Sequence, residues 1–402
     1  MSAINSIQNN HKDKILILLF LLFPITLVSV KIIGNLILLV LTLVGLIRAI
    51  REKINPFSDK RIKYFSYISV GYFLIMLFSI ILSTGISEDI SHIARKLHFL
   101  LAPLIAIAFL EKTFSLKESL FSLKIFIPIL AIAMLFENLF FGHSRPSGML
   151  NTNVFSDLVV ILTFISIANI FHEEKFDLLL SLVSAGSGLY IIILNWSRGS
   201  WLVFIVLLFL LIFLSYQGFK KRSSKKNLLF LMSLLISIIF LNNNFIYKNV
   251  TNSISNIDLH ENSYSSSGYR LEMWKSSMDA LPEMPWHGYG YRLANKEVAK
   301  YSKNHKQSVE VATHLHNEYI THLMSAGVFG LIGLFSIMFL PAYLFFRQRN
   351  NINKVLTARI GIMICLGYSI IGITHIAFGE EHINALYVFY LALLSPRINN
   401  NI

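Results

Sequence analysis

The amino-acid sequence predicts an all-α polytopic membrane protein, and three observations support that prediction. The 402-residue chain has a mean hydropathy of +0.61, and 54% of its residues are hydrophobic. Charged residues make up only 14% of the chain, whereas a soluble protein carries about 25%. The apolar residues also fall into blocks of about 15–20 residues, the length that crosses the hydrocarbon core of a bilayer as a helix.

Short polar segments separate these blocks and set the bounds of about twelve predicted spans. The first block follows the sequence HKDK and lacks a small-residue cleavage site, so we expect a retained span rather than a removed signal peptide. In chain order, the spans are expected near residues 15–30, 33–49, 66–82, 97–111, 121–139, 154–171, 178–194, 200–215, 228–242, 329–346, 356–376 and 383–396.

The net charge of +13 is concentrated in alternate loops. If the N-terminus is cytoplasmic, the cytoplasmic loops and the two tails hold most of the Lys and Arg residues. The positive-inside rule expects this bias. The charge therefore indicates topology in a lipid bilayer and does not require a nucleic-acid partner. Both termini are expected to be cytoplasmic.

The largest polar segment divides the chain into three predicted parts. Residues 1–242 hold spans one to nine, and residues 328–402 hold the last three spans and a cytoplasmic tail. Between them, residues 243–327 form a large, partly helical loop on the outer side, expected to lie on the outer leaflet as a cap. Two amphipathic helices are expected in this loop, the second at about 294–303. The apolar face of the first is predicted from Leu271, Trp274, Met278 and Leu281, which recur at helical spacing before Pro282.

Among the arginines of the predicted outward loops, those at positions 145, 198 and 270 are the candidates for a binding site. Arg198 lies in a short outward loop, where the sign bias disfavours a basic residue. One interpretation is that its guanidinium reaches the lipid headgroups. The other is that the arginines converge on a phosphate group, because a planar guanidinium binds phosphate oxygens bidentately. Nucleoside triphosphates are absent outside the cytoplasm, so an outward enzyme needs an activated donor such as a lipid-pyrophosphate-linked sugar.

Three histidines, at positions 314, 316 and 322, precede the tenth span and raise three interpretations: a metal site, a proton path or a catalytic base. On a helix, the side chains of residues 314 and 316 would point about 200° apart and those of 316 and 322 about 240° apart. A metal ion shared by the three histidines is therefore disfavoured. The only cysteine, Cys365, lies inside a span, which excludes a disulfide framework. His322 is most simply a buried helix residue. His316 precedes Asn317, which is expected to orient the imidazole or to cap the helix.

Four short motifs in order resemble the O-antigen ligase family, within the superfamily that includes O-antigen polymerases. The similarity covers most of the chain, with about twelve spans and one large outward loop late in the sequence. The Trp196 before the second motif departs from many members, which have a small or hydroxyl residue there. The motifs are RPSGMLNTN at 145–153, SRGSW at 197–201, the stretch YRLEMWKSSMDALPEMPWHGYGYR, and HNEYITHLMSAGVFG at 316–330.

The resemblance implies a reaction at the periplasmic face of the bacterial inner membrane. O-antigen polysaccharide passes from undecaprenyl pyrophosphate to a sugar hydroxyl of lipid A–core oligosaccharide, which completes lipopolysaccharide. By the match to the family motifs, Arg198 and Arg270 are expected to bind the pyrophosphate, and His316 is expected to act near the acceptor. The expected scheme inverts the anomeric carbon and requires neither a metal ion nor a cofactor.

Further residues are expected to contact the substrates. Arg145 and Asn153 are second-rank candidates from the first motif, and His314 and Asn317 flank the implied base. Glu380 and Glu381, in the last outward loop, are expected to orient His316 or to contact the acceptor, with a solvated loop as the alternative.

Three other functions stay open. An O-antigen polymerase and a protein O-oligosaccharyltransferase use the same lipid-pyrophosphate donor. A polysaccharide transporter is disfavoured because transporters place ionisable residues near mid-bilayer, where this chain has few.

Overall fold

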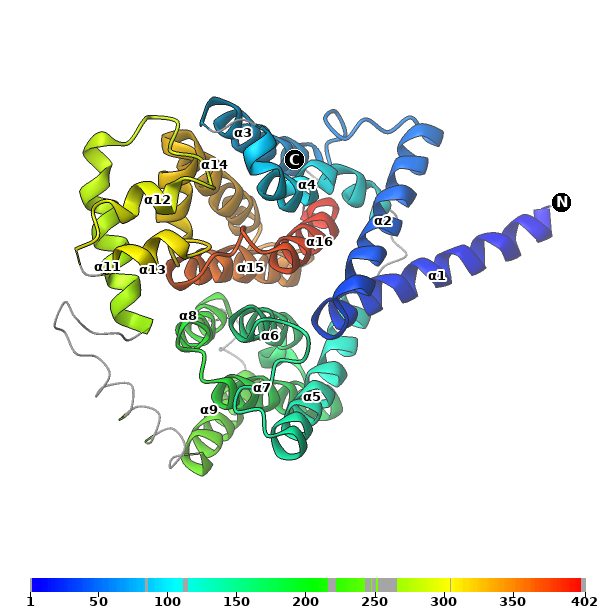
Figure 1. Cartoon of the computed structure of the whole chain (residues 1–402). Helices are drawn as coiled ribbons and strands as arrows, with labels where there is room; N and C mark the ends of the chain where they lie inside the picture. Colours follow the sequence, from blue (N-terminus) through cyan, green and yellow to red (C-terminus); the bar gives the residue numbers. More distant parts are fainter. Residues whose placement is uncertain are drawn as a thin grey trace.

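The computed structural model describes residues 2–83, 86–110, 115–215, 222–242, 247, 251, 266–303 and 305–398. Within these residues every regular element is a helix, and no strand occurs among them. Figure 1 shows the helices packed side by side, with the yellow helices α11, α12 and α13 gathered near α14. The all-α polytopic fold class is confirmed.

The helices follow the predicted apolar blocks in order. Those before the large loop are α1 (Ser2–Ser29), α2 (Lys31–Arg51), α3 (Lys63–Ser83), α4 (Ile86–Ala108), α5 (Leu116–Phe141), α6 (Thr152–Ser166), η1 (Ile170–His172), α7 (Lys175–Asn195), α8 (Arg198–Ser215) and α9 (Arg222–Leu241). Those that follow are α11 (Ser266–Ala280), η3 (Leu281–Glu283), α12 (Ala294–Ala299), α13 (Lys306–Val311), α14 (Glu318–Arg347), α15 (Val355–Thr374) and α16 (Glu381–Ile398).

Among the described residues, ten helices are long and apolar enough to cross a membrane, and they coincide with ten of the expected spans. The other two expected spans fall on the apolar part of α1, Ile15–Ser29, and on α16. Large apolar side chains such as Ile32, Phe140 and Leu241 point outward and are exposed, as a lipid-facing surface requires. The total of about twelve spans stays a prediction.

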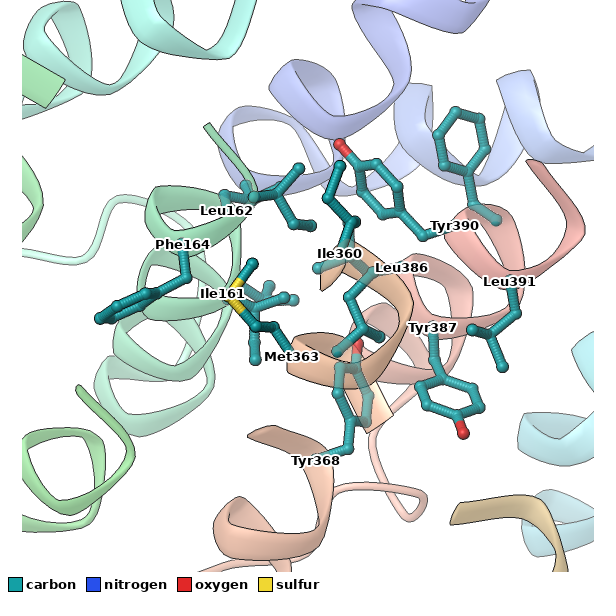
Figure 2. Close-up of a cluster of buried hydrophobic side chains, with 14 of the residues drawn as sticks. Ile161, Leu162, Phe164, Ile360, Met363, Tyr368, Leu386, Tyr387, Tyr390 and Leu391 are labelled. Atoms are coloured by element: carbon teal, nitrogen blue, oxygen red, sulfur yellow. The ribbon is translucent and has the colours of Figure 1, made fainter. Parts of the chain in front are cut away.

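The centre of the bundle is built from α6, α15 and α16. In the span Thr152–His172, 94% of the most apolar stretch is buried, so this helix is enclosed by others rather than by lipid. Figure 2 shows its side chains meeting those of α15 and α16 in one apolar cluster. The buried core holds the ends of α6 and α15 in place, and the polar segments that adjoin those ends form the candidate site.

Helix α14 begins at Glu318, earlier than the expected start near residue 329. Asn317 caps it, because its side-chain oxygen accepts a hydrogen bond from the backbone N–H of Ile320 at 3.0 Å. The helical geometry breaks at Gly327, whose φ is +63°. A side chain there would collide with the backbone at Trp286, so glycine is required for the close approach.

The first part of the predicted outward loop, residues 252–265, lies outside the described residues. In the second part, α11 confirms the expected helix, but only half of the predicted apolar face packs inward, at Trp274 and Leu281. Leu271 and Met278 are exposed. The buried face consists of Met273, Ser276, Ser277 and Ala280, because small side chains let α11 approach α12 and α14 closely.

Candidate functional site at the polar end of the helix bundle

The polar segments singled out in the sequence meet at one end of the bundle. Arg145, after α5, donates a hydrogen bond from Nε to the carbonyl oxygen of Asn195, at the end of α7, over 2.7 Å. Arg270, on α11, donates from Nη1 to the carbonyl oxygen of Thr374, at the end of α15, over 3.1 Å. Residues that are far apart in the sequence therefore share one surface.

The turn between α7 and α8 presents Arg198. Helix α7 ends at Trp196, which has a φ of +47°, and Arg198 is the first residue of α8. Gly199 then packs directly against Thr374, because a Cβ at this position would collide with the Thr374 hydroxyl. The close approach of α8 to the end of α15 brings the exposed Arg198 next to Arg270.

The guanidinium group of Arg198 lies close enough to those of Arg145 and Arg270 to repel both. Burial, followed by the charge of Arg198, lowers the pKa of both Arg145 and Arg270. The buried carboxyl group of Asp157 lies close enough to Arg270 to act in the opposite direction. Like charges gathered in this way favour a bound anion with several oxygens.

Arg145 and Asn153 form part of the framework beside Arg198. The Asn153 side-chain oxygen accepts hydrogen bonds from Arg145 Nη2 at 3.3 Å and from Ser197 Oγ at 3.4 Å. Ser200 Oγ donates to Asp157 Oδ1 at 2.7 Å. The first turn of α8 is thus tied to α6 on both sides of Arg198.

His316 occupies a strained backbone position immediately before α14. Its φ of +52° lies in the left-handed region, which is uncommon for residues other than glycine, although histidine adopts it more often than most, and which costs about 1–3 kcal/mol. Its Nδ1 is buried and has no hydrogen-bond partner among the described residues. Burial and the neighbouring Arg270 lower the pKa of His316 to about 4. At neutral pH the imidazole is therefore uncharged and can accept a proton.

Two other histidines surround His316. The ring centroid of His314 lies 4.3 Å from that of His316 and 5.7 Å from that of His375. Burial lowers the pKa of His314 to about 2 and that of His375 to about 4, with the nearby Arg270 adding to both effects. Within the part of the chain that the structure describes, no group of three or more His, Cys, Asp or Glu side chains is arranged to hold a metal ion.

Asn317 anchors the start of α14. Besides capping the helix, its Nδ2 donates a hydrogen bond to the carbonyl oxygen of Ile373 at 3.0 Å. His322 is a buried helix residue, with 1% of its side chain exposed, and its Nε2 lies 2.9 Å from Tyr72 Oη. The two acidic candidates separate, because Glu381 accepts from Asn35 Nδ2 at 2.7 Å whereas Glu380 lines a cavity next to His314.

Comparisons with known proteins show which family this chain resembles. Residues 182–335 match the family model described as O-antigen ligase, a segment that contains Arg198, Arg270 and His316. An uncharacterized protein of Haemophilus influenzae (strain ATCC 51907 / DSM 11121 / KW20 / Rd) is 25% identical over 368 residues, covering 86% of this chain and 88% of the relative. The O-antigen ligase of Escherichia coli (strain K12) is 24% identical over 252 residues, covering 60% of this chain and 57% of that protein.

The resemblance to the O-antigen ligase family is confirmed. The chain is a multi-pass membrane protein, and its matches support a place in the O-antigen ligase/polymerase superfamily. The family that these matches point to implies a glycosyltransferase-like activity in a broad sense, with lipid-linked polysaccharide as its substrate.

Sequence reasoning about the family motifs missed His375 and Asp157. The two side chains approach each other, with His375 Nδ1 3.9 Å from Asp157 Oδ2, and both lie within the electrostatic reach of Arg270. Neither belongs to a motif that resembles the O-antigen ligase family. Their positions in the sequence could have identified them, because an ionisable residue at the end of an otherwise apolar helix indicates a functional site.

Proposed function

We propose that this protein is an O-antigen ligase of the bacterial inner membrane, with its active site at the periplasmic face and both termini in the cytoplasm. It transfers O-antigen polysaccharide from undecaprenyl pyrophosphate to a sugar hydroxyl of lipid A–core oligosaccharide. The observation that supports this function best is that Arg198 lies near both Arg145 and Arg270, and that Arg270 in turn lies near His316. An anion-binding surface therefore adjoins an uncharged base.

His316 is the general base in this proposal. Its imidazole takes the proton from the acceptor hydroxyl while the hydroxyl oxygen forms a bond to the anomeric carbon of the donor. The bond between that carbon and the pyrophosphate oxygen breaks, and undecaprenyl pyrophosphate leaves with the electron pair. Direct displacement inverts the configuration of the anomeric carbon.

Arg198 and Arg270 bind the pyrophosphate and stabilise the charge that grows on it as the bond breaks. Arg270 is held before the substrate arrives by its hydrogen bond to Thr374. The packing of Gly199 against the same residue fixes the backbone from which the exposed Arg198 side chain extends. Preorganised donors of this kind are commonly the largest contribution to catalysis. Arg145 bonds to Asn153, which accepts a hydrogen bond from Ser197, the residue before Arg198.

Reconstitution in detergent tests this function. Purified protein, lipid-pyrophosphate-linked O-antigen and lipid A–core are expected to give full-length lipopolysaccharide. A polymerase would lengthen the lipid-linked polymer instead, and a protein oligosaccharyltransferase would modify a polypeptide acceptor. In cells, loss of a ligase leaves long polymer on the lipid carrier, whereas loss of a polymerase leaves single repeats on the core. A protein that produces no glycosylated lipid A–core in this assay is not a ligase.

The pH profile of kcat/KM follows from the lowered pKa of His316. A base with a pKa of about 4 is unprotonated throughout the range above pH 5, so the rate is expected to be flat from about pH 5 to 8. Below pH 4 it is expected to fall tenfold per pH unit. Initial rates between pH 3.5 and 8 check this. A midpoint near 6.5, the usual value for histidine, would contradict the depressed pKa.

A further inference from the structure

A polar cavity of about 130 Å³ lies beside His314. It is enclosed by α4, by the segment before α12, by the first turns of α14 and by the connection between α15 and α16. Neither His316 nor any arginine of the cluster at positions 145, 198 and 270 lines it. The residues that line the cavity include the polar or aromatic residues Lys96, Tyr291, His314, Glu318, Thr321 and Phe378.

Several polar atoms around this cavity are buried without a partner. Thr321 is only 4% exposed, and its Oγ1 has no hydrogen-bond partner among the described residues. The same is true of His314 Nε2 and Tyr291 Oη. Buried polar atoms in native proteins are nearly always hydrogen-bonded. These three atoms therefore require ordered water or a ligand that both donates and accepts hydrogen bonds.

The charges around the cavity are balanced, unlike those of the arginine cluster. Lys96 donates from Nζ to the carbonyl oxygen of Phe378 at 3.2 Å, and the N–H of Phe378 donates to Glu318 Oε2 at 2.9 Å. The other charged lining residues, Arg95 and Glu380, are also of opposite sign. Balanced charge disfavours a phosphate and favours an uncharged polar ligand.

A sugar ring has the matching chemistry. Its hydroxyls donate and accept hydrogen bonds, and its C–H faces pack against aromatic rings such as those of Tyr291 and Phe378. A volume of about 130 Å³ is many times the roughly 10–15 Å³ that one water requires on the same measure, so the cavity has room for a ligand the size of one sugar ring.

The position of the cavity distinguishes the acceptor sugar from the donor sugar. In a direct displacement the attacking oxygen enters opposite the leaving group, which the arginines hold. His314 lines the cavity, and its ring lies 4.3 Å from that of His316, so the cavity adjoins the base without reaching the arginines. We infer that this cavity binds the acceptor sugar ring that carries or adjoins the attacking hydroxyl. The inference rests on the proposed function, because it requires a sugar acceptor.

The variant Thr321→Val tests the inference, because it keeps the side-chain shape and removes the unpartnered hydroxyl. The KM for lipid A–core is expected to rise roughly 2- to 10-fold, as loss of one hydrogen bond predicts. The kcat and the KM for the lipid-linked donor are expected to stay unchanged. The matched control is Thr42→Val on α2, whose Oγ1 bonds to the carbonyl oxygen of Leu38 away from the cavity. All its kinetic constants are expected to equal those of the wild type.

A second variant, Thr321→Phe, fills the cavity. Its kcat/KM for the acceptor is expected to fall at least roughly tenfold, and the KM for the donor is expected to stay unchanged. Thermal unfolding in detergent shows whether each variant is folded. A folded Thr321→Phe protein with an unchanged acceptor KM, or with a change in the donor KM instead, would overturn the inference.

A binding measurement distinguishes failure of the inference about the cavity from failure of the proposed function. If the wild type transfers nothing in the reconstituted assay, the proposed function has failed, and the cavity is judged by saturation-transfer NMR. The probe is core oligosaccharide released from lipid A by mild acid. Binding to the wild type and to Thr42→Val, lost in Thr321→Phe, supports the cavity as a sugar site. Equal signals from all three proteins, or no signal from the wild type, count against it.

Discussion

Replacing His316 with alanine is expected to lower the rate of glycosyl transfer by roughly 10²–10⁴-fold, the usual contribution of a positioned base. The imidazole is uncharged at neutral pH because burial and Arg270 lower its pKa to about 4, and alanine offers no acceptor for the proton. In cells the long lipopolysaccharide bands are expected to disappear from a gel. Turnover of the purified variant measures the size of the loss.

The backbone at His316 requires a matched control. Alanine is unfavourable at a φ of +52°, whereas asparagine tolerates the left-handed region. His316→Asn therefore keeps the local backbone and still removes the base, and it is expected to be as inactive as His316→Ala. An asparagine variant that retained wild-type turnover would show that the alanine variant fails through strain, and the base assignment would be wrong.

Replacing Arg198 with lysine is expected to reduce transfer by about 10²-fold, although the charge is kept. A lysine ammonium is a point charge and does not reproduce the planar pair of N–H donors that binds phosphate oxygens bidentately. Loss of one preorganised donor commonly costs 10²–10³-fold in kcat. Turnover with purified donor and acceptor gives the value.

The control for this substitution is Arg51→Lys. Arg51 is exposed at the end of α2, at the predicted cytoplasmic side, and the same change there is expected to leave turnover unaltered. Full activity in Arg198→Lys would reduce the role of this residue to charge alone. The alternative that Arg198 only contacts lipid headgroups would then be favoured.

The sequence predicted the helices well because bilayer thickness fixes their length. Blocks of apolar residues are a local signal, and ten of the expected spans coincide with described helices. The start of α14 was placed too late because hydropathy does not register a polar first turn. Glu318 and His322 are buried against other helices, so the helix extends past its apolar part to a cap at Asn317.

The candidate residues themselves could be selected from the sequence, but their arrangement could not. Arg145, Arg198, Arg270 and His316 come from four segments, and only tertiary packing shows that Gly199 brings α8 against Thr374. The same packing places His375 and Asp157 beside them. The left-handed backbone of His316 was also not predicted, because only a few per cent of residues other than glycine adopt it.

The end of α15 serves as a common anchor for the two halves of the proposed reaction. Asn317, next to the base, bonds to the carbonyl oxygen of Ile373, and Arg270 bonds to that of the adjacent Thr374. A tilt or shift of α15 therefore carries the proton acceptor and the phosphate-binding group together as one unit. Rearrangements of the surrounding helices can admit polymers of different length while the spacing between the reacting groups stays constant. Tolerance of varied donors and precision at the reacting carbon are, in this architecture, separate properties.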